Sequence, residues 1–250
     1  MQVLQTVSTL HNLPLGQWPA ICGLALLTAC AAPVPPAVND PNEANNREVH
    51  AFNRSIDSAV LKPLTAGRTG EPGLVGQGIG NFANNLDLPG SVVNNLLQFR
   101  LGQATENTLR FGINTVLGIG GLFDPATALG VEGRESDFGE TLHVWGAPEG
   151  AYVELPFLGP STDRDTFGMV VDYALNPLRF AIPKPERYVA TAAQLASRLG
   201  DRGRYSETID SVLYDSADSY AQARLLYLQN RRFELGQTSG DDNFEDPYAE

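Results

Sequence analysis

Cysteine and histidine are scarce in this sequence. Its 250 residues include two cysteines, Cys22 and Cys30, and three histidines, His11, His50 and His143. A disulfide framework, a zinc site of closely spaced ligands and a catalytic cysteine–histidine pair therefore find no support. The nucleophile-elbow pattern Gly-x-Ser-x-Gly is absent as well. We accordingly predict a protein that is not an enzyme and that uses no metal and no cofactor.

Positive charge is also in short supply. Lysine and arginine total 17 against 29 acidic residues, a formal net charge of −12. Because phosphate backbones are bound by clustered Lys and Arg, no nucleic-acid partner is expected. An anionic membrane surface does not attract such a chain, so any membrane attachment must be apolar or covalent. Carboxylates crowd the C-terminus, and we predict an acidic, disordered tail over residues 236–250.

Past the N-terminal region, no apolar run reaches the roughly 18 residues of a membrane-spanning helix. The segment Ala20–Ala29 is too short to span a bilayer but suits the core of a signal peptide. It leads into Leu27-Thr28-Ala29-Cys30, a sequence typical of bacterial lipoprotein signals, in which the cysteine thiol takes a diacylglycerol. We therefore predict a signal peptide over residues 1–29 and covalent acyl groups on Cys30.

Two alternatives stay open for this segment. The cysteine can follow an apolar stretch by chance, and no Lys or Arg precedes Ala20, although export signals usually begin with positive charge. A misassigned start codon would explain that lack. Cleavage before Cys30 would leave one acylated cysteine in the mature chain. Ala31 after it is typical of lipoproteins sorted to the outer membrane, and residues 30–39 read as a proline-rich tether.

The stretch Asn107–Asp124 has an unusual mixture of apolar, polar and glycine positions. Leu109, Ile113, Val116 and Leu117 share one face of a predicted helix. Phe111 projects to the other side, so we expect this helix to be central.

Two further features of this stretch concern its polar and glycine positions. Arg110 and Asn114, four residues apart, point the same way. Gly118, Gly120 and Gly121 are then expected to end the helix and to act as a hinge.

Helical patterns cover most of the remaining chain. One helix is predicted to start at Asp40-Pro41 and end at Lys62-Pro63, with Val49, Phe52, Ile56 and Val60 as its apolar stripe. Another runs from Leu74 toward Leu88-Pro89, a third begins near Ser91, and a short one starts at Asp124. Further helices are predicted at 163–175, 186–199, 206–215 and 217–233. Only residues 150–160 read as extended and β-prone, so the fold class is mostly α, a single domain over residues 40–235 with little or no β.

Side-chain amides are abundant on these predicted helices, at Asn81, Asn84, Asn85, Asn94 and Gln98. Asparagine is a mediocre helix former that favours caps. The amides could line a wet passage, or they could satisfy helix ends and neighbouring loop backbones. In the helix that begins near Ser91, the pattern predicts Asn94, Asn95 and Gln98 on the side opposite Val92, Val93, Leu96 and Leu97.

Isolated candidates for chemistry have ordinary structural interpretations. We expect His50 to be a solvated surface residue, His143 to be a partly buried one, and Arg164-Asp165 to be a structural pair. The glycine-rich segments 76–80 and 118–121 lack the strand-to-helix context of a phosphate-binding loop.

Several of these segments together resemble the MlaA (VacJ) family of outer-membrane lipoproteins. The resemblance rests on Asp40-Pro41 with Asn46-Arg47, on Asn81–Leu86, on 107–124, on 137–146, on 150–160, on Arg164-Asp165 and on Asp218, Tyr220 and Arg224, in the family's order. It implies a ring-like domain of short amphipathic helices in the inner leaflet of the outer membrane, on the periplasmic side. It also implies transport of mislocalised phospholipids from the outer leaflet to a soluble periplasmic carrier, in association with trimeric porins, which maintains lipid asymmetry.

For such a protein, phospholipid is the transported ligand, and an amphipathic passage needs polar groups in an apolar wall. The candidate lipid-contact residues are Asn81, Asn84, Asn85, Asn94, Gln98, Arg110 and Asn114. The rival hypothesis is a lipid-anchored scaffold that positions porins without moving lipid. A lipid-modifying hydrolase has no motif in its favour.

Overall fold

The computed structural model describes residues 38–68 and 70–237. The predicted signal peptide, Cys30, residues 30–37 of the tether and residues 238–250 of the acidic tail lie outside this part, so the predicted domain boundaries there stay predictions.

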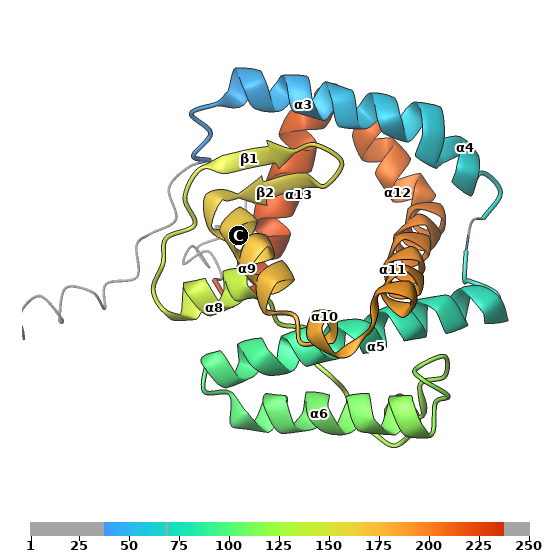
Figure 1. Cartoon of the computed structure of the whole chain (residues 1–250). Helices are drawn as coiled ribbons and strands as arrows, with labels where there is room; N and C mark the ends of the chain where they lie inside the picture. Colours follow the sequence, from blue (N-terminus) through green and yellow to red (C-terminus); the bar gives the residue numbers. More distant parts are fainter. Residues whose placement is uncertain (1–37, 69, 238–250) are drawn as a thin grey trace, which may run out of the picture. The chain divides into compact units, whose positions relative to one another are not determined.

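Helices make up most of the described residues, as the sequence predicted, and Figure 1 shows how they are arranged. They are α3 (Glu43–Ile56), η2 (Asp57–Leu61), α4 (Lys62–Thr65), α5 (Leu74–Leu97), α6 (Leu101–Val116), α7 (Pro125–Ala128), α8 (Phe138–Val144), α9 (Asp163–Leu175), α10 (Leu178–Ala181), α11 (Lys184–Arg204), α12 (Ser206–Asp210), η3 (Ser211–Asp215) and α13 (Ser219–Glu234). The strands β1 (Tyr152–Leu155) and β2 (Gly159–Thr162) form one antiparallel hairpin, within the run predicted to be β-prone.

The first helical stretch, formed by α3, η2 and α4, starts at Glu43 and ends at Thr65, both later than predicted. Helix α3 begins at Glu43 instead of Asp40-Pro41, because Asp40 accepts hydrogen bonds from Asn46, Tyr220 and Arg224 instead of capping the helix. At its other end, the π-helical turn η2 leads directly into α4. Pro63 is tolerated there because it lies in the first turn of α4, where a proline removes no required N–H donor.

The predicted break at Leu88-Pro89 does not occur. Helix α5 is continuous over 24 residues with Pro89 inside it. Proline cannot donate to the carbonyl four residues earlier and normally disrupts a helix interior. Here α5 packs against both α6 and α11, and this tertiary packing outweighs the local signal.

In the first helical stretch, polar side chains are buried and apolar ones are exposed, which is the opposite of an amphipathic helix in a water-soluble protein. Asn46 and His50 of α3 and Asp57 of η2 are buried, whereas Phe52 of α3 and Val60 of η2 are exposed. The prediction of a solvated His50 is therefore wrong: its ring nitrogens contact Glu154 Oε1 at 3.3 Å and Ser219 Oγ at 3.1 Å. The polar stripe of α3 faces the hairpin and α13, and the apolar stripe faces outward.

The same reversal holds for α5 and α6. Asn94, Asn95 and Gln98, which were predicted on the side opposite the apolar residues of this helix, are buried, while Leu96 is exposed. In α6, Leu109, Val116 and Leu117 are exposed, and the buried residues are Ala104, Asn107 and Asn114. The expectation of a central helix is thus wrong: α6 lies at one edge, packed on α5 (Figure 1).

Polar side chains consequently outnumber apolar ones in the interior. Among the described residues, 19 polar or charged residues are buried against 9 hydrophobic ones. Asn46 illustrates how they are satisfied, since its Nδ2 donates to Asp40 and to the Tyr152 carbonyl, and its Oδ1 accepts from the Glu154 amide. Such bonds are needed because an unpaired buried polar group costs roughly 1–3 kcal/mol.

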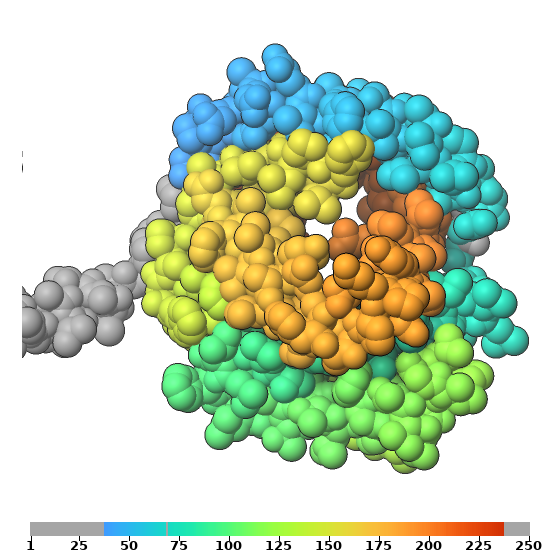
Figure 2. Space-filling view, viewed as in Figure 1, coloured from blue at the N-terminus to red at the C-terminus, as the bar shows by residue number. Residues whose placement is uncertain are grey.

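Within the unit that starts at Val38, the elements surround a central space. In Figure 1, α3, α11, α5 and the hairpin with α9 border it. The space-filling view shows that atoms leave part of this space open when seen from that side (Figure 2).

The ion pair between Asp57 and Arg202 joins α11 to the end of α3. Arg202 Nε and Nη2 donate to the two Asp57 oxygens at 2.7 and 2.9 Å, and Tyr214 donates to Oδ2 at 2.8 Å. Burial by itself would raise the pKa of Asp57, but these donors lower it below the ordinary value of 3.8.

We predict that Asp57→Asn lowers the free energy of unfolding by about 2 kcal/mol, because it removes the buried one of the two carboxylates that pair with Arg202 and leaves only Asp210, 2.6 Å away, among the described residues. Thermal or denaturant unfolding in detergent measures this loss. Asp215→Asn, at an exposed position outside this ion pair, is the matched control and should change stability little. Because the folded pKa of Asp57 is depressed, the wild-type stabilisation should be present above about pH 4 and disappear as the pH falls through the folded pKa. A variant as stable as wild type at pH 7 would contradict the assignment.

Candidate functional site: a polar pocket between two helices and a loop

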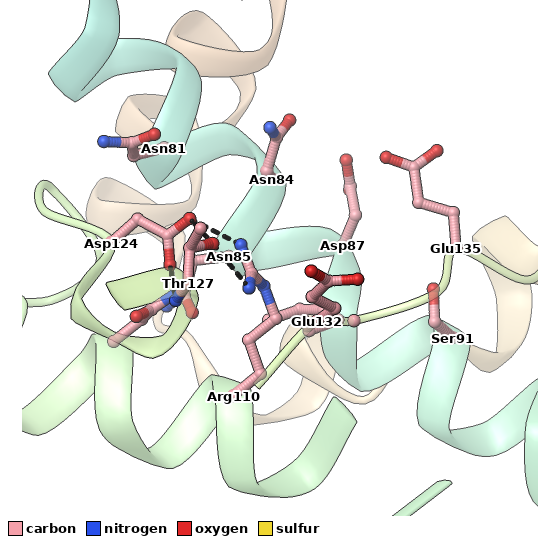
Figure 3. A pocket seen from close by; sticks show the side chains of 13 residues that line it. Asn81, Asn84, Asn85, Asp87, Ser91, Arg110, Asp124, Thr127, Glu132 and Glu135 are labelled. Atoms are coloured by element: carbon pink, nitrogen blue, oxygen red, sulfur yellow. Dashed lines mark hydrogen bonds and ion pairs between the residues drawn. The ribbon is translucent and has the colours of Figure 1, made fainter. Parts of the chain in front are cut away.

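Five of the seven predicted lipid-contact residues lie together. Asn81, Asn84, Asn85, Arg110 and Asn114 line one pocket, whose cavity volume is about 280 Å³ (Figure 3). Its walls are α5, α6, α7 and the loops on either side of α7. That these residues contact lipid stays a prediction.

Helical spacing explains why α5 contributes so many groups to this wall. Positions three and four residues apart share one face of a helix, and Asn81, Asn84, Asn85 and Leu88 follow that spacing. Asp87 and Ser91, also on the wall, extend the polar face. Asp87 accepts a hydrogen bond from Gln194 of α11 at 2.7 Å, so this wall reaches a helix that borders the central space (Figure 1).

Arg110 and Asn114 of α6 are both held by Asp124. Arg110 Nη2 lies 2.5 Å from Asp124 Oδ2, and Asn114 Nδ2 donates to Oδ1 at 2.9 Å. Arg110 also donates to the Thr127 hydroxyl and to the Val131 carbonyl, as the close-up shows for Thr127 (Figure 3). The guanidinium therefore joins the glycine-rich loop and α7 to α6 through three hydrogen bonds.

The carboxylate of Asp124 is the centre of this attachment. It also caps α7 by accepting from the Thr127 amide at 3.2 Å. Burial would raise the pKa of Asp124, but the hydrogen bonds from Thr127 and Asn114 and the charge of Arg110 hold it below 3.8. The residue is thus ionised at neutral pH, and one wall of the pocket is fixed in place.

Asn94 and Gln98 are not part of this pocket. Asn94 Nδ2 donates to Asp172 Oδ1 at 2.7 Å, which joins α5 to α9. Gln98 Nε2 donates to the hydroxyls of Ser136 and Thr141, each at 2.9 Å. In these contacts both amides bond to side chains of other segments, and not to the helix ends or loop backbones that the sequence suggested.

Close contacts distinguish the three candidate hinge glycines. A Cβ at Gly118 would lie 2.3 Å from the Phe123 carbonyl oxygen, and one at Gly121 would lie 2.7 Å from the Asn85 side chain. Gly120 has open space around it and a φ of +71°. Any side chain is therefore excluded at two of these positions by packing, and only Gly120 has room for one.

Three carboxylates on the pocket wall were missed in the sequence. Asp87 follows Asn84 by three residues, so the spacing that grouped the asparagines also places it on the same face. Glu132 and Glu135 lie in the loop between α7 and α8, which reads as an ordinary polar loop. Nothing in the local pattern of that loop indicates that it folds back over α5.

The described residues contain no group of three or more His, Cys, Asp or Glu side chains placed to hold a metal ion. His143 is partly buried, as expected, and burial lowers its pKa. Arg164 and Asp165 are both buried and paired, with Arg164 Nε 3.2 Å from Asp165 Oδ1. Across residues 38–68 and 70–237, no helix is both long enough and apolar enough to cross a membrane.

Fold and site together define a helical protein with a polar interior, an apolar exterior and a polar pocket between helices. Residues 38–234 match the MlaA lipoprotein family, and the chain belongs to that family. The resemblance to this family that the sequence motifs indicated is therefore confirmed.

Several relatives are similar over most of their length. An uncharacterised protein of Rickettsia bellii is 36% identical over 196 residues, covering 78% of this chain and 76% of the relative. The intermembrane phospholipid transport system lipoprotein MlaA of Haemophilus influenzae is 34% identical over 203 residues, covering 79% of each chain. Its Escherichia coli counterpart is 31% identical over 218 residues, covering 84% of this chain and 85% of the relative.

A solved structure described as the structural basis for maintenance of bacterial outer membrane lipid asymmetry superposes with a TM-score of 0.66. It is 29% identical in sequence, and the match covers 78% of this chain and 98% of that chain. The similarity supports both the mostly helical fold and the family assignment.

Proposed function

We propose that this protein is a phospholipid-transport lipoprotein of the outer membrane, which removes mislocalised phospholipids from the outer leaflet and so maintains lipid asymmetry. The observation that carries the proposal is the reversed polarity of the helices in a member of the MlaA family. Family membership supports the function, because the relatives of Haemophilus influenzae and Escherichia coli are lipoproteins of an intermembrane phospholipid transport system.

The reversed polarity suits a protein surrounded by lipid. Leu101, Leu109, Val116 and Leu117 on α6 are more than half exposed, and in water such a surface would cost free energy in proportion to its area. In the inner leaflet of the outer membrane, acyl chains would cover it without a membrane-spanning helix. We propose this location, on the periplasmic side, with the acyl groups on Cys30 as a further anchor.

A route shielded from water explains how such a protein could move lipid without making or breaking covalent bonds. Exposing acyl chains to water costs about 0.8 kcal/mol per CH₂, so a lipid with two chains of ~16 carbons faces a barrier on the order of 25 kcal/mol. A passage through the central space would keep the chains against apolar groups, while polar groups such as those on α5 accept the headgroup. We propose that lipid leaves this passage to a soluble periplasmic carrier and that the protein associates with a trimeric porin.

The decisive experiment is a reconstituted assay of passage. Vesicles containing the full lipidated chain and a porin are mixed with the carrier, and phospholipid that reaches the carrier is measured. We expect transfer that depends on the chain. A scaffold that only positions porins would bind the porin and give no transfer above vesicles with porin alone, and that result would refute the proposal. Released fatty acid or lysolipid would point instead to a hydrolase.

The proposed membrane location predicts where a new tryptophan is quenched. In vesicles whose acyl chains carry bromine, Leu117→Trp should add fluorescence that the bromine quenches, because this exposed side chain would lie among the chains. Gln222→Trp, at an exposed polar position on α13, is the control and should be quenched much less. Equal quenching at both positions would count against a lipid-covered α6.

The hinge proposal is best tested at Gly120, since Gly118 and Gly121 have no space for a side chain. Gly120→Ala must hold a Cβ at positive φ, which costs about 1–2 kcal/mol, so the protein should stay folded. If motion of the loop 118–121 accompanies passage, the stiffened variant should transfer lipid several-fold more slowly. Wild-type transfer with a lowered melting temperature would show that Gly120 matters for stability alone.

A further inference from the structure

The pocket wall carries more negative than positive charge, since Asp87, Asp124, Glu132 and Glu135 line it together with one guanidinium, that of Arg110. The guanidinium of Arg110 is directed to Asp124, Thr127 and Val131. Glu132 and Glu135 form no hydrogen bond or ion pair with another residue in the described part of the chain, and both are exposed in the pocket. An anionic ligand would therefore meet these two carboxylates and a guanidinium that is already paired with Asp124.

Asn85 adds a buried acceptor to this wall. The residue is only 3% exposed and lines the pocket. Its Nδ2 donates to the Thr115 hydroxyl at 3.1 Å, while its Oδ1 has no hydrogen-bond partner among the described residues. A buried acceptor without a donor is costly, and a ligand with N–H groups could supply the missing donor.

The pKa of Asp87 reflects its position in this pocket wall. Burial in the surrounding protein raises the pKa of Asp87, and the nearby charge of Glu135 adds to the rise; the hydrogen bond from Gln194 and the charge of Arg198 oppose it. The side chain is nevertheless accessible to solvent, as expected on a concave wall. A cation placed here would relieve the repulsion between these carboxylates.

The spacing of the carboxylates favours an organic cation over a metal ion. A divalent metal needs several oxygen ligands within about 2.6 Å, and no group of side chains in the described part of the chain is placed to hold one. A primary ammonium is different, because it carries its own three donors and can bond to separate acceptors.

We propose that this pocket selects phospholipids whose headgroup ends in a primary ammonium, such as phosphatidylethanolamine, over anionic lipids such as phosphatidylglycerol. The inference rests on the proposed transport function and names its preferred substrate class. In this arrangement the ammonium lies among Asp87, Glu132, Glu135 and the Asn85 carbonyl, with the lipid phosphate directed away from them.

The test uses the full lipidated chain in vesicles that hold equal amounts of phosphatidylethanolamine, phosphatidylcholine and phosphatidylglycerol. Lipid bound to the purified protein and lipid passed to the carrier are both identified by mass spectrometry. We expect phosphatidylethanolamine to be enriched about fivefold over phosphatidylglycerol, since ion pairs with partly exposed carboxylates are individually weak. Phosphatidylcholine should fall between them, because it has the positive charge but no N–H donor.

The double variant Glu132→Gln with Glu135→Gln should bring the bound lipid close to the vesicle composition. Both side chains are exposed and unpaired, so folding should not change. Glu48→Gln with Glu207→Gln removes the same charge from exposed positions outside the pocket and should keep the enrichment. An enrichment that survives in the first variant, or none in wild type, overturns the inference.

The two levels of the proposal fail in different ways. Passage of all three lipids at equal rates would leave the transport function standing and remove the headgroup selection. Bound lipid enriched in phosphatidylethanolamine without any passage would support the ammonium site and refute transport.

Discussion

A polar side chain that leaves water must find a hydrogen-bond partner inside the protein, and this requirement governs how the helices of this molecule face one another. Asn46 and His50 of α3 and Asp57 of η2 are buried, and each is bonded to a different element. A single neutral bond of this kind contributes only about 1 kcal/mol net, but leaving either partner alone costs more. The elements are therefore held in specific positions by complementary polar groups, where a soluble protein would rely on a close-packed apolar core.

The same constraint decides what the outside of the protein must be. The polar side chains of α3, α5 and α6 face the interior. Because the apolar side chains lie on the opposite faces of these helices, Phe52, Leu96 and Leu117 are exposed. An apolar exterior is stable where the solvent is itself apolar. The proposed leaflet location and a polar interior are thus consistent with one arrangement, and the proposed passage for an amphipathic lipid needs both.

The pocket between α5 and α6 divides its polar groups between two tasks. Arg110, Asn114 and Asp124 form hydrogen bonds with one another and with the loop backbone, and these bonds hold the pocket wall in place. Asn85, Asp87, Glu132 and Glu135 retain acceptors that nothing else in the described chain uses fully. The first group of residues holds the pocket in shape, and the second group is free to contact a ligand. We therefore assign headgroup selection to the carboxylates of the second group and not to Arg110.

Local patterns in the sequence determined most of the helices, the extended run at residues 150–160, the helix start at Asp124 and the motifs of the MlaA family, because spacing and capping act over a few residues. They also placed the asparagines of α5 on one face. Only the tertiary structure decided which face is buried, since a helical period is the same whether its apolar side meets a protein core or lipid. That is why His50 was predicted to be solvated and α6 to be central. The continuity of α5 through Pro89 and the approach of Glu132 and Glu135 to Asp87 likewise depend on contacts between distant segments, on which no local pattern reports.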